Sequence, residues 1–291
     1  MKHLEVLSQI QSDGLFTVEI GAGATPFAGS NLIIDKYPFD NLERAGNIST
    51  IAPLIKADAI NLPFVDLSVD LLFLSQVIEH IEDPLLFLAE AKRTSKKIYL
   101  EWPSPTREVI FGWTFHRWVI EISGSTMTFY KNDLPQLCGG FFHNEYDVFF
   151  IQYLEHNHQK FNNYYYGETQ DLKFTISDQS ALSYLSNKYI KKIDFPEVVG
   201  SKKKPATTII KLMAKAFLKE IFPPEFKQAI KDLLNKKSTN MNDKNVSDLL
   251  ANKLLCIKCK EVLIDLEKPC KCGFKALKIN GIYTFDTDDY K

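Results

Sequence analysis

Residues 18–26 read VEIGAGATP, a short apolar run that leads into a glycine turn. Glycine at positions 21 and 23 lets the backbone turn tightly and approach a ligand closely, because glycine has no Cβ. A dinucleotide site would normally show GxGxxG, with the pyrophosphate at the N-terminus of the next helix. Pro26 stands where the third glycine would be. The motif therefore predicts a nucleoside-binding turn but does not favour a dinucleotide.

The segments around this turn alternate between strand and helix patterns from residue 17 to residue 103. Four apolar segments predict strands: TVEIG (17–21), NLIID (31–35), the start of SVDLLFLSQVIEHI (68–81) and KKIYLEWPSP (96–105). DPLLFLAEAKRTS (83–95) has helical spacing and predicts a helix that begins near Asp83 or Pro84. Crossover helices between strands imply an α/β fold with a doubly wound, mostly parallel sheet. We also expect YDVFFIQYLE (146–155) and LKFTIS (172–177) to supply late strands of this sheet.

Three carboxylates follow the strand pattern and indicate the chemistry of the ligand. Glu19 lies at the entrance of the glycine turn, where it would repel phosphate but attract an ammonium group. Asp35 ends the next strand and can accept hydrogen bonds from both ribose hydroxyls. Asp58 falls where another strand should end, within reach of an adenine amino group. The pattern predicts a ligand with adenosine, a cationic amino-acid tail and no phosphate.

At these residues the chain resembles the class I S-adenosylmethionine-dependent methyltransferases, especially the type 11 group. VEIGAG, LIID, ADAINLPF and SVDLLFLSQVIEHIEDP resemble four successive segments of that family, over about residues 15–103. The resemblance implies a Rossmann-like fold and S-adenosylmethionine as cofactor. Thr25 departs from the family, in which many members carry a third glycine. The residues implied in the cofactor pocket are Glu19, Gly21, Ala22, Gly23, Asp35, Asp58, Ala59 and Ser75.

Three residues are candidates for catalysis. His80 follows the fourth strand and could act as a base or could only support the start of a helix. His116, between Trp113 and Trp118, could bind an acceptor or be a buried histidine in an aromatic core. Glu101 follows the fifth strand and could face the acceptor or pair with a lysine. The fourth strand is not followed by the Asn/Asp-Pro-Pro-Tyr run of resembling nitrogen methyltransferases, which disfavours methylation of adenine or glutamine.

Aromatic residues accumulate after the predicted sheet, and we expect residues 104–166 to form a lid over the acceptor. An aromatic stripe can equally be part of the core. Domain assignment follows from these patterns. We predict a methyltransferase domain at 1–200, a basic helical segment and linker at 201–249, and a cysteine-rich module at 250–291.

Four of the five cysteines lie in the last 36 residues, within CIKCKEVLIDLEKPCKCGF (256–274). Cys256, Cys259, Cys270 and Cys272 form a CxxC and a CxC, and four thiolates can close a tetrahedral shell around structural Zn²⁺. Unmetallated thiols are the alternative. Residues 253–286 also resemble the zinc-ribbon activator proteins of tRNA and protein methyltransferases, which implies a module docked on the catalytic domain. A nucleic-acid-binding ribbon is the rival interpretation, although nearby acidic residues offset its lysines.

Residues 202–237 hold ten lysines against three acidic residues. The stretch at 206–222 has an apolar helical face and a lysine face, so it could contact an anionic membrane surface or pack on the domain. RNA could also use these lysines. The formal net charge of the 291-residue chain is only −1, so charge alone indicates neither partner. We see no signal peptide or spanning segment and expect a cytoplasmic protein, with peripheral contact with a membrane as an open alternative.

These patterns predict an S-adenosylmethionine-dependent methyltransferase with a structural zinc ribbon. A small molecule, or a saccharide or lipid-linked precursor, is the expected acceptor, methylated on oxygen. An RNA methyltransferase is one alternative, based on the ribbon and the lysine run. A cofactor-binding scaffold without turnover is the other, since no base is unambiguous.

Overall fold

The computed structural model describes residues 3–40, 48, 51–135, 150, 153–154, 156–189 and 243–290. Several predicted features lie outside these residues: Cys138, most of YDVFFIQYLE, and the basic segment with its helix at 206–222. The described parts belong to one compact unit, residues 1–189 together with 241–291. No helix among them is long and apolar enough to cross a membrane.

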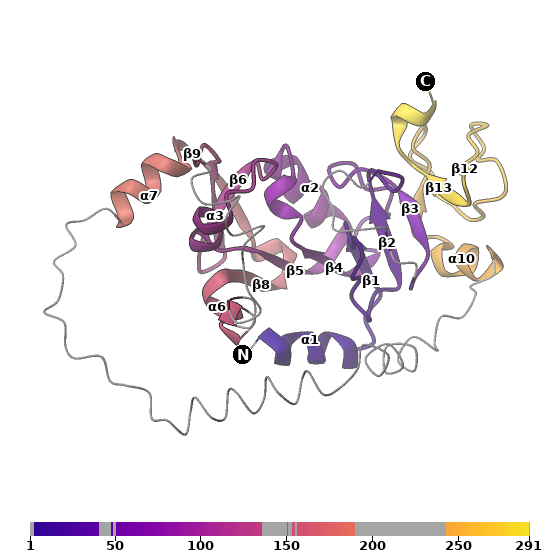
Figure 1. Ribbon diagram of the computed structural model, residues 1–291. Helices are drawn as coiled ribbons and strands as arrows, with labels where there is room; N and C mark the ends of the chain where they lie inside the picture. Colours follow the sequence, from indigo (N-terminus) through magenta and orange to yellow (C-terminus); the bar gives the residue numbers. More distant parts are fainter. Residues whose placement is uncertain are drawn as a thin grey trace, which may run out of the picture. The chain divides into compact units, whose positions relative to one another are not determined.

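The central sheet has eight strands in the order β12-β13-β3-β2-β1-β4-β5-β8 (Figure 1). Neighbours from β13 to β5 are parallel, whereas β8 and β12 pair antiparallel at the two edges. The strand order reverses between β1 and β4, which is where ligands bind in such sheets. The strands are β1 (Thr17–Ile20), β2 (Leu32–Asp35), β3 (Leu54–Lys56), β4 (Val69–Ser75), β5 (Ser95–Pro103), β8 (Asn162–Glu168), β12 (Leu277–Ile279) and β13 (Ile282–Thr284). The prediction of a doubly wound, mostly parallel sheet is confirmed.

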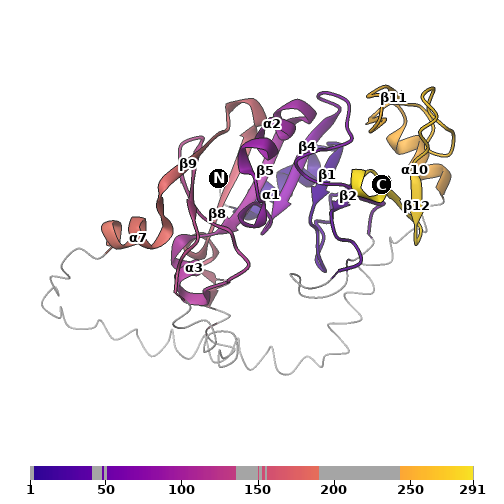
Figure 2. The same ribbon diagram turned by 90° about the horizontal axis from the view of Figure 1, so that it is seen from above.

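Helices cover both faces of this sheet, as Figures 1 and 2 show for α1 (His3–Ser12) and α2 (Pro84–Thr94). Leu72 and Leu74 of β4 belong to the core that includes α2. Leu71 and Phe73 of the same strand belong to the core that includes α1. A central parallel strand buried on both faces reads as a continuous apolar run, which explains the sequence VDLLFLS. Asp83 caps α2 by accepting from the backbone N–H groups of Leu85 and Leu86, as the sequence predicted for the helix start.

The remaining elements are two smaller sheets and several short helices. They are η1 (Ile78–His80), α3 (Pro105–Phe111), β6 (Trp118–Ser123), β7 (Thr126–Lys131), α6 (His158–Phe161), η2 (Thr169–Asp171), β9 (Lys173–Ser180), α7 (Ala181–Tyr189), α10 (Asp243–Leu250), β10 (Leu254–Leu255), β11 (Val262–Leu263) and η3 (Thr287–Tyr290).

Two expectations about the middle of the chain need correction. LKFTIS does not join the central sheet, because it lies in β9, which pairs with β7 in a separate sheet ordered β6-β7-β9. The edge of the central sheet is taken instead by β8, which runs antiparallel to β5. The range predicted as a lid, 104–166, therefore contains part of a strand of the central sheet, including Tyr164–Tyr166. Ile120 of β6 lies in the predicted lid range, and its carbonyl accepts from the Trp102 indole N–H of β5, which ties the small sheet to the large one.

The C-terminal segment extends the central sheet, which the sequence did not predict. Tyr283 and Thr284 of β13 pair with Ile55 and Lys56 of β3 in parallel register. The Lys56 ammonium then lies 2.8 Å from the Asp289 carboxylate and 3.4 Å from that of Asp286. These side chains are at most 18% exposed, so the attraction is only partly screened by water.

Replacing Lys56 by methionine should lower the free energy of unfolding by about 1–3 kcal/mol, because two mostly buried carboxylates lose their counter-charge. Urea denaturation measures this change. Lys268→Met is the matched control: this lysine pairs with Asp265 but is 80% exposed, so its loss should cost less than about 0.5 kcal/mol. Equal effects of the two substitutions would contradict a structural role for the Lys56 contacts.

Candidate cofactor pocket and cysteine cluster

The glycine turn brings the end of β1 against the segment after β4. Gly21 and Gly23 have φ of +67° and +57°, a region that L side chains rarely adopt. The Gly21 N–H donates to the carbonyl of Ile34, which holds the turn on β2. A Cβ at Gly21 would lie 2.7 Å from Cγ2 of Val77. This approach requires glycine.

Glu19 points into the fold beneath the glycine turn. Its carboxylate accepts from the backbone N–H of Phe27 at 2.9 Å and from the Ser30 hydroxyl at 2.6 Å. The side chain is 3% exposed, and burial raises its pKa to about 7. Glu19 therefore holds the loop that follows the turn, a role that its position in the sequence did not reveal.

Asp35 and Asp58 lie at the carboxyl ends of β2 and β3. Asp35 accepts from the backbone N–H of Tyr37 at 2.7 Å and is 8% exposed. Asp58 accepts from the N–H of Ile60, and its other oxygen lies 2.6 Å from the Lys36 ammonium. Both aspartates are thus fixed in place by local contacts, and Asp58 carries a cationic partner that the sequence did not predict.

These elements enclose a pocket of about 460 Å³, a volume within the usual range for small-molecule sites. Of the predicted site residues, Gly21, Gly23, Asp35, Asp58, Ala59 and His80 line it. Its lining does not include Glu19, Ala22, Ser75, Glu101 or His116. Ala22 packs instead in a small core with Ile33 and Ala52. Ser75 is the last residue of β4, one position before the lining begins at Gln76.

The pocket also has lining residues that sequence reasoning missed. Lys36 and Tyr37 follow β2, and their position after the predicted strand end was a usable signal. Gln76 has φ of +58°, which is uncommon for a residue other than glycine and which no sequence motif announces. Arg117 reaches the pocket from β6's N-terminal side, and its backbone N–H donates to the carbonyl of Glu79.

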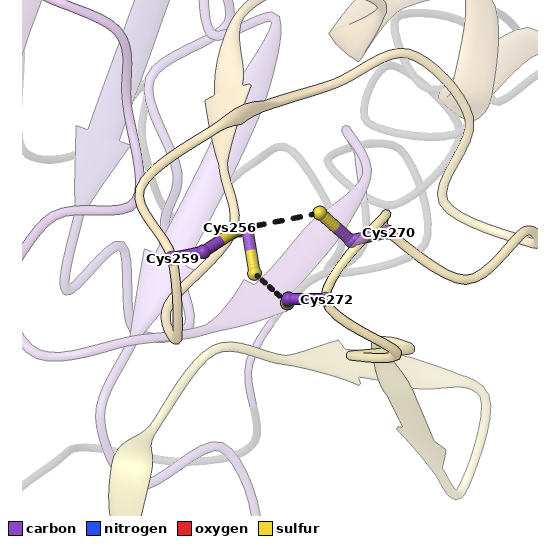
Figure 3. Close-up of side chains that lie close together, drawn as sticks. All are labelled: Cys256, Cys259, Cys270 and Cys272. Carbon is purple, nitrogen blue, oxygen red and sulfur yellow. Dashed lines mark hydrogen bonds between the residues drawn. The ribbon is translucent and has the colours of Figure 1, made fainter.

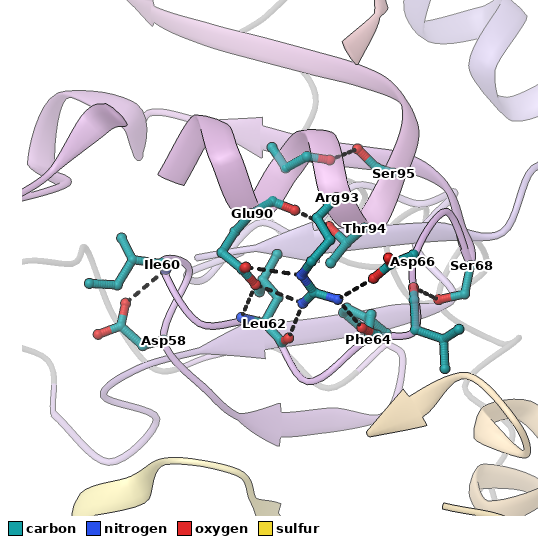
Figure 4. Close-up of polar contacts among 12 residues, drawn as sticks. Asp58, Ile60, Leu62, Phe64, Asp66, Ser68, Glu90, Arg93, Thr94 and Ser95 are labelled. Carbon is teal, nitrogen blue, oxygen red and sulfur yellow. Dashed lines mark hydrogen bonds and ion pairs between the residues drawn. The ribbon is translucent and has the colours of Figure 1, made fainter. Parts of the chain in front are cut away.

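An arginine on α2 fixes the loop after β3 (Figure 4). Arg93 donates to the carbonyls of Phe64 and Leu62, and it forms an ion pair with Glu90 at 2.8 Å. Glu90 in turn accepts from the backbone N–H of Leu62. These contacts satisfy buried backbone groups of the loop that carries Asp58 and Ala59.

The three predicted catalytic residues lie in different surroundings. The ring of His80 stacks on Phe115 and meets the ring of His116 edge-on, with centroids 4.7 Å apart. His116 is 6% exposed, and its Nδ1 lies 2.7 Å from the carboxylate of Glu108. Glu101 accepts from the Tyr99 hydroxyl, and its other carboxylate oxygen lies 3.0 Å from Nε2 of His158. His80 and His116 are brought together, and Glu101 is held apart from the pocket.

The four C-terminal cysteines converge, as Figure 3 shows. The sulfur atoms of Cys256 and Cys272 lie 3.6 Å apart, and those of Cys259 and Cys270 lie 3.5 Å apart. All four are free thiols. Zn–S bonds of about 2.3 Å in a tetrahedron place sulfur atoms about 3.8 Å apart, so the cluster fits Zn²⁺ with a small adjustment.

Comparison with known proteins agrees with this geometry. Residues 34–97 match the model of the methyltransferase domain family. This match supports the predicted class of enzyme. The matched segment runs from β2 into β5 and includes Asp35, Asp58 and His80.

Several solved structures are similar to parts of the chain. The YcgJ protein of Bacillus subtilis is 18% identical over 35% of this chain and 52% of its own, with a TM-score of 0.26. The complex of the Haloferax volcanii Trm112 methyltransferase activator with a putative methyltransferase contains a chain that is 14% identical. The match covers 57% of this chain and 90% of that one, with a TM-score of 0.35. A SAM-dependent methyltransferase from Aquifex aeolicus is 15% identical over 57% of this chain and 88% of its own, with a TM-score of 0.30. The chain thus spans about half of the Bacillus protein, and at these TM-scores the likenesses do not bear on activity. No curated protein matches the chain.

The buried Glu19 carboxylate should make stability depend on pH. Its pKa of about 7 lies above the ordinary value of 4.5, so the folded state holds the proton more tightly than the unfolded state. Its contribution to the free energy of unfolding is therefore present below about pH 4.5 and is lost as pH rises through about 7. We expect Glu19→Gln to remove a decline on the order of 2–3 kcal/mol between pH 5 and pH 8.

Urea denaturation at several pH values in this window measures the decline. The exposed Glu261→Gln substitution is the control and should follow the wild-type pH profile. An unchanged slope in Glu19→Gln would show that the pKa of Glu19 is not raised by burial.

Proposed function

We propose that this protein transfers a methyl group from S-adenosylmethionine to an oxygen atom of a small-molecule or saccharide acceptor. The observation that carries the proposal is the pocket at the strand-order reversal, where the glycine turn meets Asp35 and Asp58 within a methyltransferase domain. Bound there, S-adenosylmethionine would supply an electrophilic methyl group on a sulfonium.

The residues of the pocket fit adenosine without phosphate. Asp35 offers a carboxylate at the end of β2, the position from which ribose hydroxyls are bound in such folds. Tyr37 is 59% exposed at the pocket and offers an aromatic face for a base. Lys36 is engaged by Asp58, which lowers the positive charge available to a phosphate. Together these contacts favour a nucleoside with a zwitterionic tail.

The acceptor is assigned to oxygen because the chain has Gln76-Val77-Ile78-Glu79 after β4, and not the run used by resembling nitrogen methyltransferases. An oxygen acceptor must lose its proton during transfer, and His80 is the predicted catalytic residue that lines the pocket. We therefore place acceptor activation at His80. Apart from this step, alignment of the acceptor and exclusion of water supply much of the rate in methyl transfer.

We also propose that Cys256, Cys259, Cys270 and Cys272 bind one structural Zn²⁺. The sulfur separations of 3.5 and 3.6 Å support this, and a shell of four thiolates leaves no open position for catalysis. Cys256 is buried in the same core cluster as Leu254 and Phe64, so the metal would stabilise the segment that packs on the sheet.

Calorimetry with S-adenosylhomocysteine tests the cofactor assignment. Gly21→Ala should weaken binding more than tenfold, because the added Cβ would meet Val77 at 2.7 Å. Gly23→Ala is the matched control, since it has a similar φ but nothing within 4 Å of the added Cβ, and it should weaken binding less. Folded wild-type protein that binds neither S-adenosylhomocysteine nor S-adenosylmethionine would overturn the assignment.

Metal analysis after gel filtration tests the zinc proposal. Wild-type protein should retain about one equivalent of zinc, and Cys259→Ser should lose most of it together with thermal stability. Cys138→Ser, which changes the cysteine outside the cluster, should retain the metal. Equal zinc content in the two variants would argue against the site.

Labelled methyl transfer into metabolite, lipid and RNA pools tests the acceptor. Incorporation into small metabolites or saccharides supports the proposal. Incorporation into RNA alone would favour the alternative of an RNA methyltransferase. Cofactor binding without transfer into any pool would favour a scaffold.

A further inference from the structure

A polar cluster lies behind the pocket and contains three side chains with metal-binding chemistry. One ligand atom each from Glu79, His80 and His116 lies within 4.8 Å of the others. Glu79 and His80 belong to η1 after β4, whereas His116 precedes β6. The Arg117 side chain donates to the carbonyl of His80, and the Arg117 N–H donates to that of Glu79, so backbone contacts hold the two loops together.

The Glu79 carboxylate is the unusual member of this cluster. It is 1% exposed, and among the described residues neither of its oxygen atoms has a hydrogen-bond partner. Burying a carboxylate without a partner is costly, and native proteins normally pair or coordinate such a group. The side chain therefore needs a ligand or a proton.

His116 is oriented as a metal-binding histidine would be. Its Nδ1 lies 2.7 Å from the buried carboxylate of Glu108, and its ring stacks on Trp113 at 4.7 Å. Histidines that bind metals commonly place one ring nitrogen on a carboxylate, which fixes the ring and raises the basicity of the other nitrogen. With Nδ1 on Glu108, Nε2 is the atom that coordination would use.

The charge around the cluster is compatible with a cation. Glu79 interacts electrostatically with the carboxyl groups of Glu101 and Glu108 and with the guanidinium of Arg107. Arg107 itself donates to Asn162 and lies over the rings of Phe111 and Trp113. A divalent cation bound here would give the Glu79 carboxylate a counter-charge.

We propose that Glu79, His80 and His116 bind a divalent transition-metal cation next to the cofactor pocket. Two imidazoles and one carboxylate are a ligand set used by zinc and by non-haem iron, and such a set leaves coordination positions open. Metal–ligand bonds of about 2.0–2.2 Å in a tetrahedron place ligand atoms about 3.4 Å apart, so atoms that lie within 4.8 Å of one another would approach by at most about 1.4 Å. This site is distinct from the cysteine cluster, whose four thiolates would form a closed shell around the proposed Zn²⁺.

The position of His80 gives the cation a chemical role, and this part rests on the proposed methyl transfer. His80 lines the pocket, so an acceptor hydroxyl there can occupy an open position on the metal. Coordination lowers the pKa of the hydroxyl, and its proton leaves to water. A lone pair of the acceptor oxygen then forms the new C–O bond while the C–S bond breaks, and the electron pair of the broken C–S bond stays on sulfur. Activation at His80 is thus achieved through the bound cation, and the acceptor class is one whose oxygen atoms can bind a metal.

Titration with Co²⁺ of the zinc-containing full-length protein, without cofactor, tests the site. We expect one Co²⁺ per chain by equilibrium dialysis, with visible d–d absorption and no sulfur charge-transfer band, because the ligands are nitrogen and oxygen. Glu79→Gln should weaken Co²⁺ binding more than tenfold, since it removes the anionic ligand with little change of volume. His80→Asn, on the pocket side, is the second variant and should do the same.

His156→Asn and Glu121→Gln are the matched controls and should bind Co²⁺ as wild type does, because His156 and Glu121 are not in the cluster. Calorimetry with S-adenosylhomocysteine on every variant reports whether the pocket is folded. Wild-type protein that binds the nucleoside but no Co²⁺ beyond its zinc would overturn the metal site alone, as would Glu79→Gln and His80→Asn variants that both bind Co²⁺ with the affinity of the wild type. Co²⁺ binding without nucleoside binding would instead overturn the proposed function and leave the metal site standing.

Discussion

The close approach between Gly21 and Val77 is the constraint on which the pocket depends. β1 and β4 are parallel neighbours in the sheet, so the segments that follow them leave the sheet at the same end and pass close to each other. Only glycine lets them do so, because Cβ at position 21 would overlap the Val77 side chain. Glu19 completes the arrangement from below by holding the N–H of Phe27 and the hydroxyl of Ser30. Sheet order, turn and loop are therefore parts of a single geometric solution.

The sequence predicted the parts of this solution that depend on local pattern. The strand ends at Ile20 and Asp35 followed from apolar runs, and the start of α2 followed from Asp83 and Pro84. It could not predict contacts between distant segments. The inward direction of Glu19 depends on the Ser30 loop, and the pairing of Lys36 with Asp58 depends on β2 lying next to β3. The assignment of LKFTIS to the wrong sheet has the same origin, because an alternating segment indicates a strand and not its partner.

The C-terminal segment shows how a long-range pairing can complete a fold. Without β13, the edge of β3 would be an unpaired row of backbone groups. The chain covers this edge with its own last strands and fixes the join through Lys56 and two aspartates. The loop after β3 carries Asp58, so the pairing also stabilises a wall of the pocket. The four cysteines of the cluster lie between β10 and β12, in the same C-terminal segment that supplies β13.

The polar groups on the two sides of the pocket differ in how many partners they have. Asp35 and Asp58 each have a local hydrogen-bond or ion-pair partner. In contrast, among the described residues both carboxylate oxygens of Glu79 and one of Glu108 are buried without a hydrogen-bond partner. Gln76, at a φ of +58°, is held in this strained conformation by the carbonyl of Glu101 and by Asn162. Strain and uncompensated charge both lower stability, and a chain keeps them where they serve a site. The strained Gln76 and the buried Glu79 both lie in the segment after β4, which also carries His80 of the pocket lining, so under the proposed methyl transfer this segment is where we expect the acceptor to be selected.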